Sequence, residues 1–207
     1  MPEEHSDYVV VLVVDVNNKM GENPAPEVSK TAETETELLD ALKYDNVNVT
    51  VSEDITVTGN LDLNGNTVSV DSGKILTVNK NLYLNGGTLT GDGTVDVKDT
   101  TYMGSTLSVA NFSTKYAQIA KDATMYIKDG NVTITNNISG DGKLVISGNS
   151  TKIDVKGNLG VNVTAKDSAK LTFGSKDADV AIDGNSGNVT PYSVEKDTKV
   201  RAFNVVK

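Results

Sequence analysis

The chain has 207 residues, a formal net charge of −9 and a hydrophobic share of 37%, enough apolar material for a packed core. It contains no Cys, which excludes disulfide frameworks, thiolate metal sites and cysteine nucleophiles. Arg occurs once, at Arg201. We expect no nucleic-acid partner because such binding needs a basic face. We also expect no membrane partner, because an acidic chain is repelled by anionic lipid surfaces and its longest apolar run is far below the ~20 residues of a bilayer span.

Residues 1–30 are predicted to form an N-terminal anchor strand followed by a Pro-containing linker. The acidic start lacks the pattern of an export signal, so synthesis and retention in the cytoplasm are expected. The apolar run does not alternate, which is typical of a strand covered on both faces. Two interpretations stay open: the run pairs with the edge of the following domain, or it is donated to a protein partner in a larger assembly. The residues predicted to make this contact are Tyr8, Val9, Val10, Val11, Leu12, Val13, Val14 and Val16.

A short amphipathic helix is predicted over residues 34–43. Thr34 and Glu37 have the spacing of a capping box, and Leu38, Leu39 and Leu42 share one face. Such a helix suits the end of a repetitive domain, where an uncovered core and strand edge need a cap.

The rest of residues 31–207 consists of short apolar pairs in i, i+2 spacing, each typical of a strand of three to five residues. The pairs recur about every 19 residues, which predicts an all-β fold: a parallel β-solenoid, or β-helix, with about 19 residues per turn. A first ladder runs through Val49/Val51, Val68/Val70, Leu89, Leu107/Val109, Met125/Ile127, Leu144/Ile146, Val161/Val163 and Val180/Ile182. A second ladder runs through Val57, Val78, Val97, Ile134, Val155 and Phe173.

Asn and Gly mark the corners between these strands, for example at residues 64–66 and 85–87. In a stacked coil, equivalent corners lie over one another, so their Asn side chains are expected to form ladders. The helix at residues 34–43, the strands at 47–51 and 55–57 and the corner at 61–66 together resemble the opening of right-handed parallel β-helix proteins of the pectate-lyase-like superfamily. That superfamily includes polysaccharide lyases, phage tailspikes and fibres, and bacterial adhesins, and the likeness is one of fold without a specific motif.

Catalysis is not expected, and no cofactor is predicted. A polysaccharide lyase of the resembled superfamily would typically combine calcium-binding Asp residues with an Arg or Lys base, and the single Arg lies near the C-terminus. The carboxylates available are Asp92, Asp96, Asp99, Asp141 and Asp154. Asp92 and Asp141 lie in Gly-Asp-Gly corners and are weak calcium candidates, although a plain turn explains them better.

Tyr102 and Tyr116 are the candidates for a glycan contact, because they lie where the repeat pattern blurs and a blurred turn suggests an inserted loop on a binding face. The preferred hypothesis is a non-catalytic, homo-oligomeric attachment protein of a bacteriophage virion, a head-decorating fibre or short spike, bound to capsid or other virion proteins by its N-terminal strand. The alternatives are an extracellular surface adhesin or polysaccharide-binding module of a bacterium, with a host surface glycan as ligand, and a polysaccharide lyase.

Overall fold

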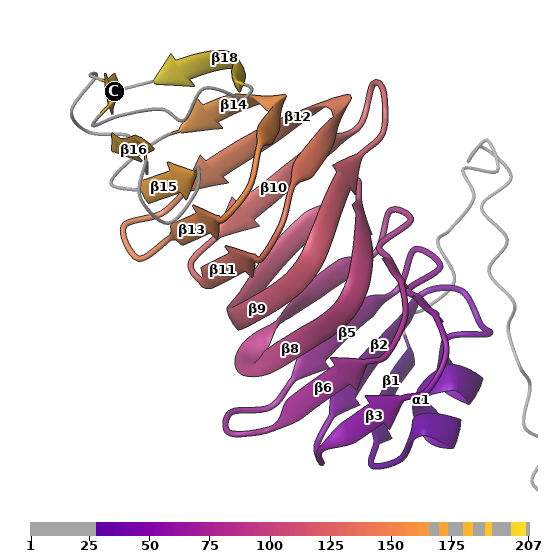
Figure 1. Cartoon of the computed structure of the whole chain (residues 1–207). Coiled ribbons are helices and arrows are strands. Elements are labelled where there is room, and N and C mark those ends of the chain that lie inside the picture. Colours follow the sequence, from indigo (N-terminus) through magenta and orange to yellow (C-terminus); the bar gives the residue numbers. More distant parts are fainter. Residues whose placement is uncertain (1–27, 166–169, 174–179, 184–188, 192–199, 206–207) are drawn as a thin grey trace, which may run out of the picture.

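The computed structural model describes residues 28–165, 170–173, 180–183, 189–191 and 200–205. These residues form a parallel β-solenoid of about seven turns with about 19 residues per turn, as the periodicity predicts. Figure 1 shows the turns stacked into an elongated body, with the helix at the end where the described chain begins. The predicted anchor strand, Tyr8–Val16, lies outside the described residues.

Each turn of the solenoid passes through three short strand positions, so the coil has three faces, here called face 1, face 2 and face 3. Face 1 comprises β1 (Val28–Ala32), β2 (Val47–Val51), β5 (Thr67–Val70), the first parts of β8 (Thr88–Met103) and β9 (Thr106–Ile119), β10 (Thr124–Lys128), the second parts of β12 (Ile138–Ser147) and β14 (Leu159–Ala165), and β18 (Val200–Val205).

Face 2 comprises β3 (Ile55–Val57), β6 (Ile75–Val78), the middle of β8 and β9, β11 (Asn131–Ile134), β13 (Lys152–Val155) and β15 (Lys170–Phe173). Face 3 comprises β4 (Leu61–Asp62), β7 (Leu82–Tyr83), the ends of β8 and β9 and the first residues of β12 and β14. All these neighbours pair in parallel, which places equivalent residues of successive turns side by side.

Several strands are longer than the expected three to five residues, β8 and β9 most of all. β8 has 16 residues and β9 has 14, and each runs across all three faces. The pairing between them shifts register at two places, between Gly91 and Thr94 and between Val97 and Thr100. The chain therefore turns these corners by bulge-like irregularities within one continuous strand, and Gly91 at the first of them has φ +108.

From β1 to β14 the inward residues of the strands form the interior, and nearly all of these side chains are aliphatic and fully buried. The described buried polar side chains are Asn66, Thr101, Thr114 and Thr151. Thr101 Oγ1 donates to Thr114 Oγ1 at 2.9 Å, and Thr114 Oγ1 lies 3.0 Å from the carbonyl oxygen of Asp99. The polar groups of this pair therefore remain hydrogen-bonded inside the core.

The second ladder is confirmed, with Thr114 in the step between Val97 and Ile134. As far as Val161/Val163, the first ladder assigns the right strand to each turn, but its register is wrong at two steps: Leu107 lies beside Ile127, and Leu144 lies beside Val163. A shift by two residues keeps the same side chains facing inward, so alternation alone does not exclude it.

The expected parallel rung at Val180/Ile182 is wrong. β16 (Val180–Asp183) pairs antiparallel with β15 and with β17 (Val189–Pro191). The turn that follows β14 on face 1 is β18, where Phe203 lies beside Val163. An alternating apolar strand has the same inward face in either direction, so the pattern carries no information on strand polarity.

The predicted helix is confirmed as α1 (Glu35–Ala41), with Thr34 as N-cap and both hydrogen bonds of the capping box present. The N–H groups of Glu33 and Thr34 donate to the Glu37 carboxylate, which lowers the pKa of Glu37. Leu38 is buried over the end of the core, and the Glu35 carboxylate accepts from the backbone N–H and hydroxyl of Thr58 at 2.7 and 2.9 Å. The buried Leu38 and the hydrogen bonds of Glu35 thus hold the helix against the first turn of the solenoid.

The first strand of the solenoid, β1, pairs in parallel with β2 and includes Val28, Ser29 and Lys30. These three residues precede the boundary at residue 31 that the sequence suggested between linker and solenoid.

Amide ladders between stacked Asn side chains were expected, but at three corners the Asn side chains bond to backbone instead. Asn60 Oδ1 accepts from the N–H of Asn81, and Asn81 Oδ1 accepts from the N–H of Thr100. Asn137 Oδ1 accepts in the same way from the N–H of Asn158. Each Asn therefore satisfies a backbone donor in the next turn, where the corner interrupts the strand pairing.

Asn66 stabilises the helix-covered end of the solenoid. Its Oδ1 accepts from the N–H of Val47 at 2.9 Å, and its Nδ2 donates to the carbonyl oxygen of Tyr44 at 2.9 Å. We expect Asn66→Leu to lower the free energy of unfolding by about 2–3 kcal/mol, because it leaves a buried N–H without its partner. Chemical denaturation of the variant beside Asn79→Leu, at an exposed corner, measures this. Equal losses in both variants would contradict the role of Asn66.

Candidate binding site

Two tyrosines stack on the outer surface of face 3. Tyr83 of β7 and Tyr102 of β8 are register partners, and each lies between two inward-facing residues. Their ring centroids are 4.6 Å apart and the ring planes differ by 2°. This separation is close to the spacing of neighbouring strands, so the parallel register itself brings the rings face to face.

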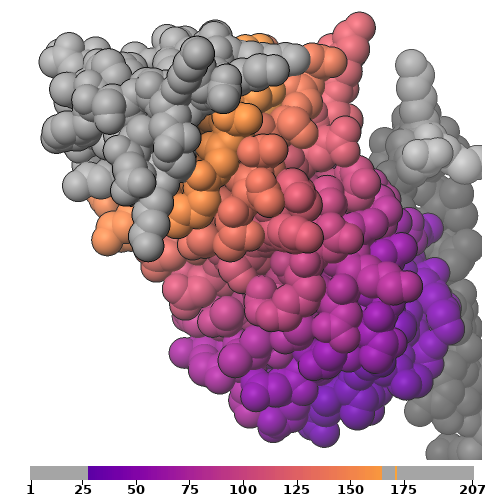
Figure 2. Space-filling view, viewed as in Figure 1, coloured from indigo at the N-terminus to yellow at the C-terminus, as the bar shows by residue number. Residues whose placement is uncertain are grey.

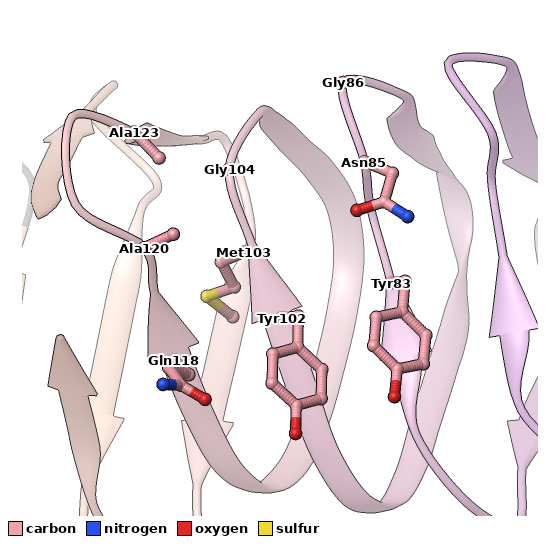
Figure 3. Close-up of a pocket in the computed structure, with 9 residues that line it drawn as sticks. All are labelled: Tyr83, Asn85, Gly86, Tyr102, Met103, Gly104, Gln118, Ala120 and Ala123. Atoms are coloured by element: carbon pink, nitrogen blue, oxygen red, sulfur yellow. The ribbon is translucent and has the colours of Figure 1, made fainter.

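A hollow of about 350 Å³ lies beside this stack, at the corner where face 3 turns back to face 1. The residues that line it are Tyr83, Asn85, Gly86, Tyr102, Met103, Gly104, Gln118, Ala120 and Ala123. Figure 3 shows the two parallel rings on neighbouring strands, Gln118 on the next strand and the two alanines on the adjoining loop. None of these side chains carries a charge.

Two side-chain amides flank the tyrosines. Asn85 Nδ2 donates to Asp62 Oδ2 at 2.8 Å, which fixes the amide with its oxygen as the remaining acceptor. Gln118 is exposed and is the register partner of Tyr102 on the side away from Tyr83. The hydroxyl of Tyr83 accepts from Asn81 Nδ2 at 3.3 Å. The corner therefore combines a rigid aromatic surface with hydrogen-bonding groups at its rim.

The two tyrosines predicted as glycan contacts do not share a site. Tyr102 lines the hollow, whereas Tyr116 pairs in register with Thr100, and the Nζ of Lys115 lies 5.3 Å from its ring centroid. The partner of Tyr102 is Tyr83. The spacing of 19 residues between Tyr83 and Tyr102 is one turn of the coil, and this signal was available in the sequence.

The expectation of an inserted loop at Tyr102 and Tyr116 is wrong. The segment around them contains β9, which forms a complete turn across all three faces. The apolar pattern blurs here because Thr101, Thr114 and Ala117 occupy inward positions that hold larger aliphatic residues in other turns. Tyr126 is 51% exposed on β10, on the outer surface of face 1.

The two Gly-Asp-Gly corners lie in different places. Gly91 adjoins Val70 where face 1 meets face 2, and Gly140 adjoins Ile119 where face 3 meets face 1. Asp92 and Asp141 are therefore not stacked, and both are exposed. Within the described residues, no group of three His, Cys, Asp or Glu side chains is placed to hold a metal ion.

The glycines of these corners have a packing role instead. A Cβ on Gly91 would lie 2.3 Å from the carbonyl oxygen of Val70, and one on Gly140 would lie 1.9 Å from that of Ile119. Only glycine allows the backbones of successive turns to approach so closely.

Asp96 on face 2 is held as a carboxylate. Its partial burial opposes ionisation, but hydrogen bonds from Lys98 Nζ and from Ser113 Oγ outweigh burial and lower the pKa of Asp96. Asp154 forms an ion pair with Lys156 at the same i, i+2 spacing. Such pairs stabilise the outer surface, whereas a general acid needs a raised pKa.

Comparison with models of protein families, with curated proteins and with solved structures gave no match. The β-helix is therefore shown by the strand pairing alone. No helix in the described part of the chain has the length and apolar character of a bilayer-spanning segment.

Proposed function

We propose that this chain is a non-catalytic attachment protein, in which the solenoid is a stiff shaft and the apolar segment Tyr8–Val16 joins it to protein partners in a larger assembly. The observation that carries the proposal is the continuous apolar column inside the stacked turns, from Leu38 to Leu171. Figure 2 shows the successive turns as one continuous body on the face in view.

A shaft of this kind is stabilised along its whole length by parallel hydrogen bonding and by the buried column. Each turn buries its inward side chains against the turns before and after it, so bending would open the core on one side. Stiffness and length are the properties that a spike, fibre or adhesin stalk needs. The polar outward residues keep the shaft hydrated over its length.

The pKa shifts of the carboxylates in the described residues support a non-catalytic role. Of the described carboxylates, Glu37 and Asp96 have lowered pKa values, each explained by structural hydrogen bonds. Cleavage of a glycosidic bond by hydrolysis needs two carboxylates facing each other across the substrate, one of them with a raised pKa. The proposal therefore assigns these groups to the stability of the shaft.

The preferred setting is a bacteriophage virion, with the chain as a head-decorating fibre or short spike in several copies. The sequence features behind this choice are the lack of Cys and the apolar segment followed by a Pro-containing stretch.

Sedimentation of the full chain beside a variant lacking residues 7–16 tests whether this segment joins several copies of the chain. We expect the full chain to sediment as an oligomer and the shortened chain as a monomer with unchanged circular dichroism. A matched control replaces one outward residue of the shaft, Thr50→Asp, and should sediment as the full chain does. A full chain that is monomeric at 21.9 kDa, like the shortened variant, would contradict association of several copies through this segment.

Fractionation of the producing culture tests the setting. Co-purification of the chain with virus-sized particles on a density gradient is the result expected for a virion component. Recovery with the bacterial envelope alone would overturn the virion setting and favour the surface adhesin.

A further inference from the structure

We propose that the hollow beside the Tyr83–Tyr102 stack binds one neutral pyranose ring of a carbohydrate. The inference stands on this corner of the solenoid alone, and is independent of the assembly proposed above.

The aromatic pair provides a rigid surface before any ligand arrives. The rings lie 4.6 Å apart and within 2° of parallel, and the hydroxyl of Tyr83 is hydrogen-bonded to Asn81. Little side-chain entropy is therefore lost when a ligand packs on Tyr102. The face of Tyr102 that Tyr83 does not cover is turned towards Gln118 and the hollow.

Four of the residues that line the hollow are small. Gly86, Gly104, Ala120 and Ala123 lie at successive corners, where larger side chains would fill the space. The volume of about 350 Å³ falls in the range of pockets that take small molecules. A pyranose ring suits such a space, because its C–H groups pack on an aromatic face while its hydroxyl groups point outward.

The rim offers groups that match those hydroxyls. Asn85 is oriented by its bond to Asp62, so its amide oxygen is set as an acceptor, and Gln118 presents both an acceptor and donors. A few such groups around a largely apolar surface fix the orientation of a ligand.

The lining also excludes acidic sugars. It carries no cationic side chain to pair with a carboxylate, and burying an unpaired charge is costly. The nearby carboxylate of Asp62 and the net charge of −9 repel an anion further. A neutral hexose is therefore favoured over a uronic acid.

Ligand-observed and protein-observed NMR on the full chain test this. The probes are methyl β-D-glucopyranoside, methyl β-D-galactopyranoside and methyl N-acetyl-β-D-glucosaminide, with methyl β-D-glucuronide as the charged comparison. We expect at least one neutral probe to bind with a dissociation constant of roughly millimolar, as small polar ligands in open sites do. It should shift the amide signals of Gln118 and Met103.

Three variants locate the binding. Tyr102→Ala removes the platform, and Ala120→Phe fills the hollow from an exposed position and leaves both tyrosines in the sequence. Both should weaken binding by about tenfold or more. Tyr126→Ala, an exposed tyrosine on face 1, should leave it unchanged.

Three results would overturn the proposal: no neutral probe binds, the glucuronide binds as well as the neutral probes, or folded Ala120→Phe binds as the parent chain does. Circular dichroism of each variant confirms that the solenoid is intact. Because Ala120 is exposed, its variant decides the outcome even if Tyr102→Ala fails to fold.

Discussion

Gly140→Ala is expected to lower the free energy of unfolding by about 2–5 kcal/mol. Gly140 has φ +130, a left-handed value that costs a non-glycine residue about 1–2 kcal/mol. Its Cβ would also lie 1.9 Å from the carbonyl oxygen of Ile119 in the neighbouring turn, and overpacking of this kind costs about 1–3 kcal/mol. Urea denaturation followed by circular dichroism measures the loss.

Substitutions at two other glycines serve as controls that distinguish the steric clash from the backbone strain. Gly65 has φ +78 and nothing within 4 Å of an added Cβ, so Gly65→Ala should cost about 1–2 kcal/mol from strain alone. Gly59 has neither a positive φ nor a near neighbour, and Gly59→Ala should change stability by less than about 0.5 kcal/mol. If Gly140→Ala lowers the free energy of unfolding no more than Gly65→Ala does, the backbones of successive turns do not approach closely at Gly140.

Phe112→Ala is expected to cost about 3–5 kcal/mol, since removing a buried aromatic side chain leaves a cavity that the neighbours do not fill. Phe112 is 2% exposed and lies between Val95 in the turn before and Val132 in the turn after. The cavity therefore interrupts the apolar column in the middle of the shaft.

The matched controls for this prediction are Phe112→Leu and Ile75→Ala. Phe112→Leu keeps most of the volume and should cost less than about 1.5 kcal/mol. Ile75 is 43% exposed on face 2, so its truncation removes little buried surface and should cost less than about 1 kcal/mol. A loss in Phe112→Ala no larger than that in Ile75→Ala would mean that Phe112 does not lie in the core.

Much of the fold was readable from the sequence, because a coil whose turns stack in parallel repeats its buried positions at a nearly constant interval. Val57, Val78 and Val97 follow this interval and lie side by side as predicted. The capping helix was readable from Thr34 and Glu37, since capping depends on residues close in sequence.

The register and the strand directions were only partly readable. Alternation has a period of two, so placing Leu107 beside Met125 or beside Ile127 buries the same set of residues. Thr114 was missed because a buried threonine carries no apolar signal; its hydroxyl is satisfied by Thr101 and a backbone carbonyl, a contact that only the folded structure provides.

The candidate site was readable in part. The aromatic platform follows from the register, since Tyr83 and Tyr102 are one turn apart. The hollow beside it depends on how the loop with Ala120 and Ala123 passes the corner, which depends on loop conformation and not on residue type alone.

Distances between spin labels test the parallel stack most directly. The chain has no native Cys, so labels can be placed on Thr31 paired with Ser108, Lys128 or Ser147, whose strands succeed one another on the outer surface of face 1. At the spacing of neighbouring strands, the account predicts distances of about 19, 24 and 29 Å, growing by about 5 Å for each added turn. Distances that do not rise in this order would contradict the stacked parallel solenoid.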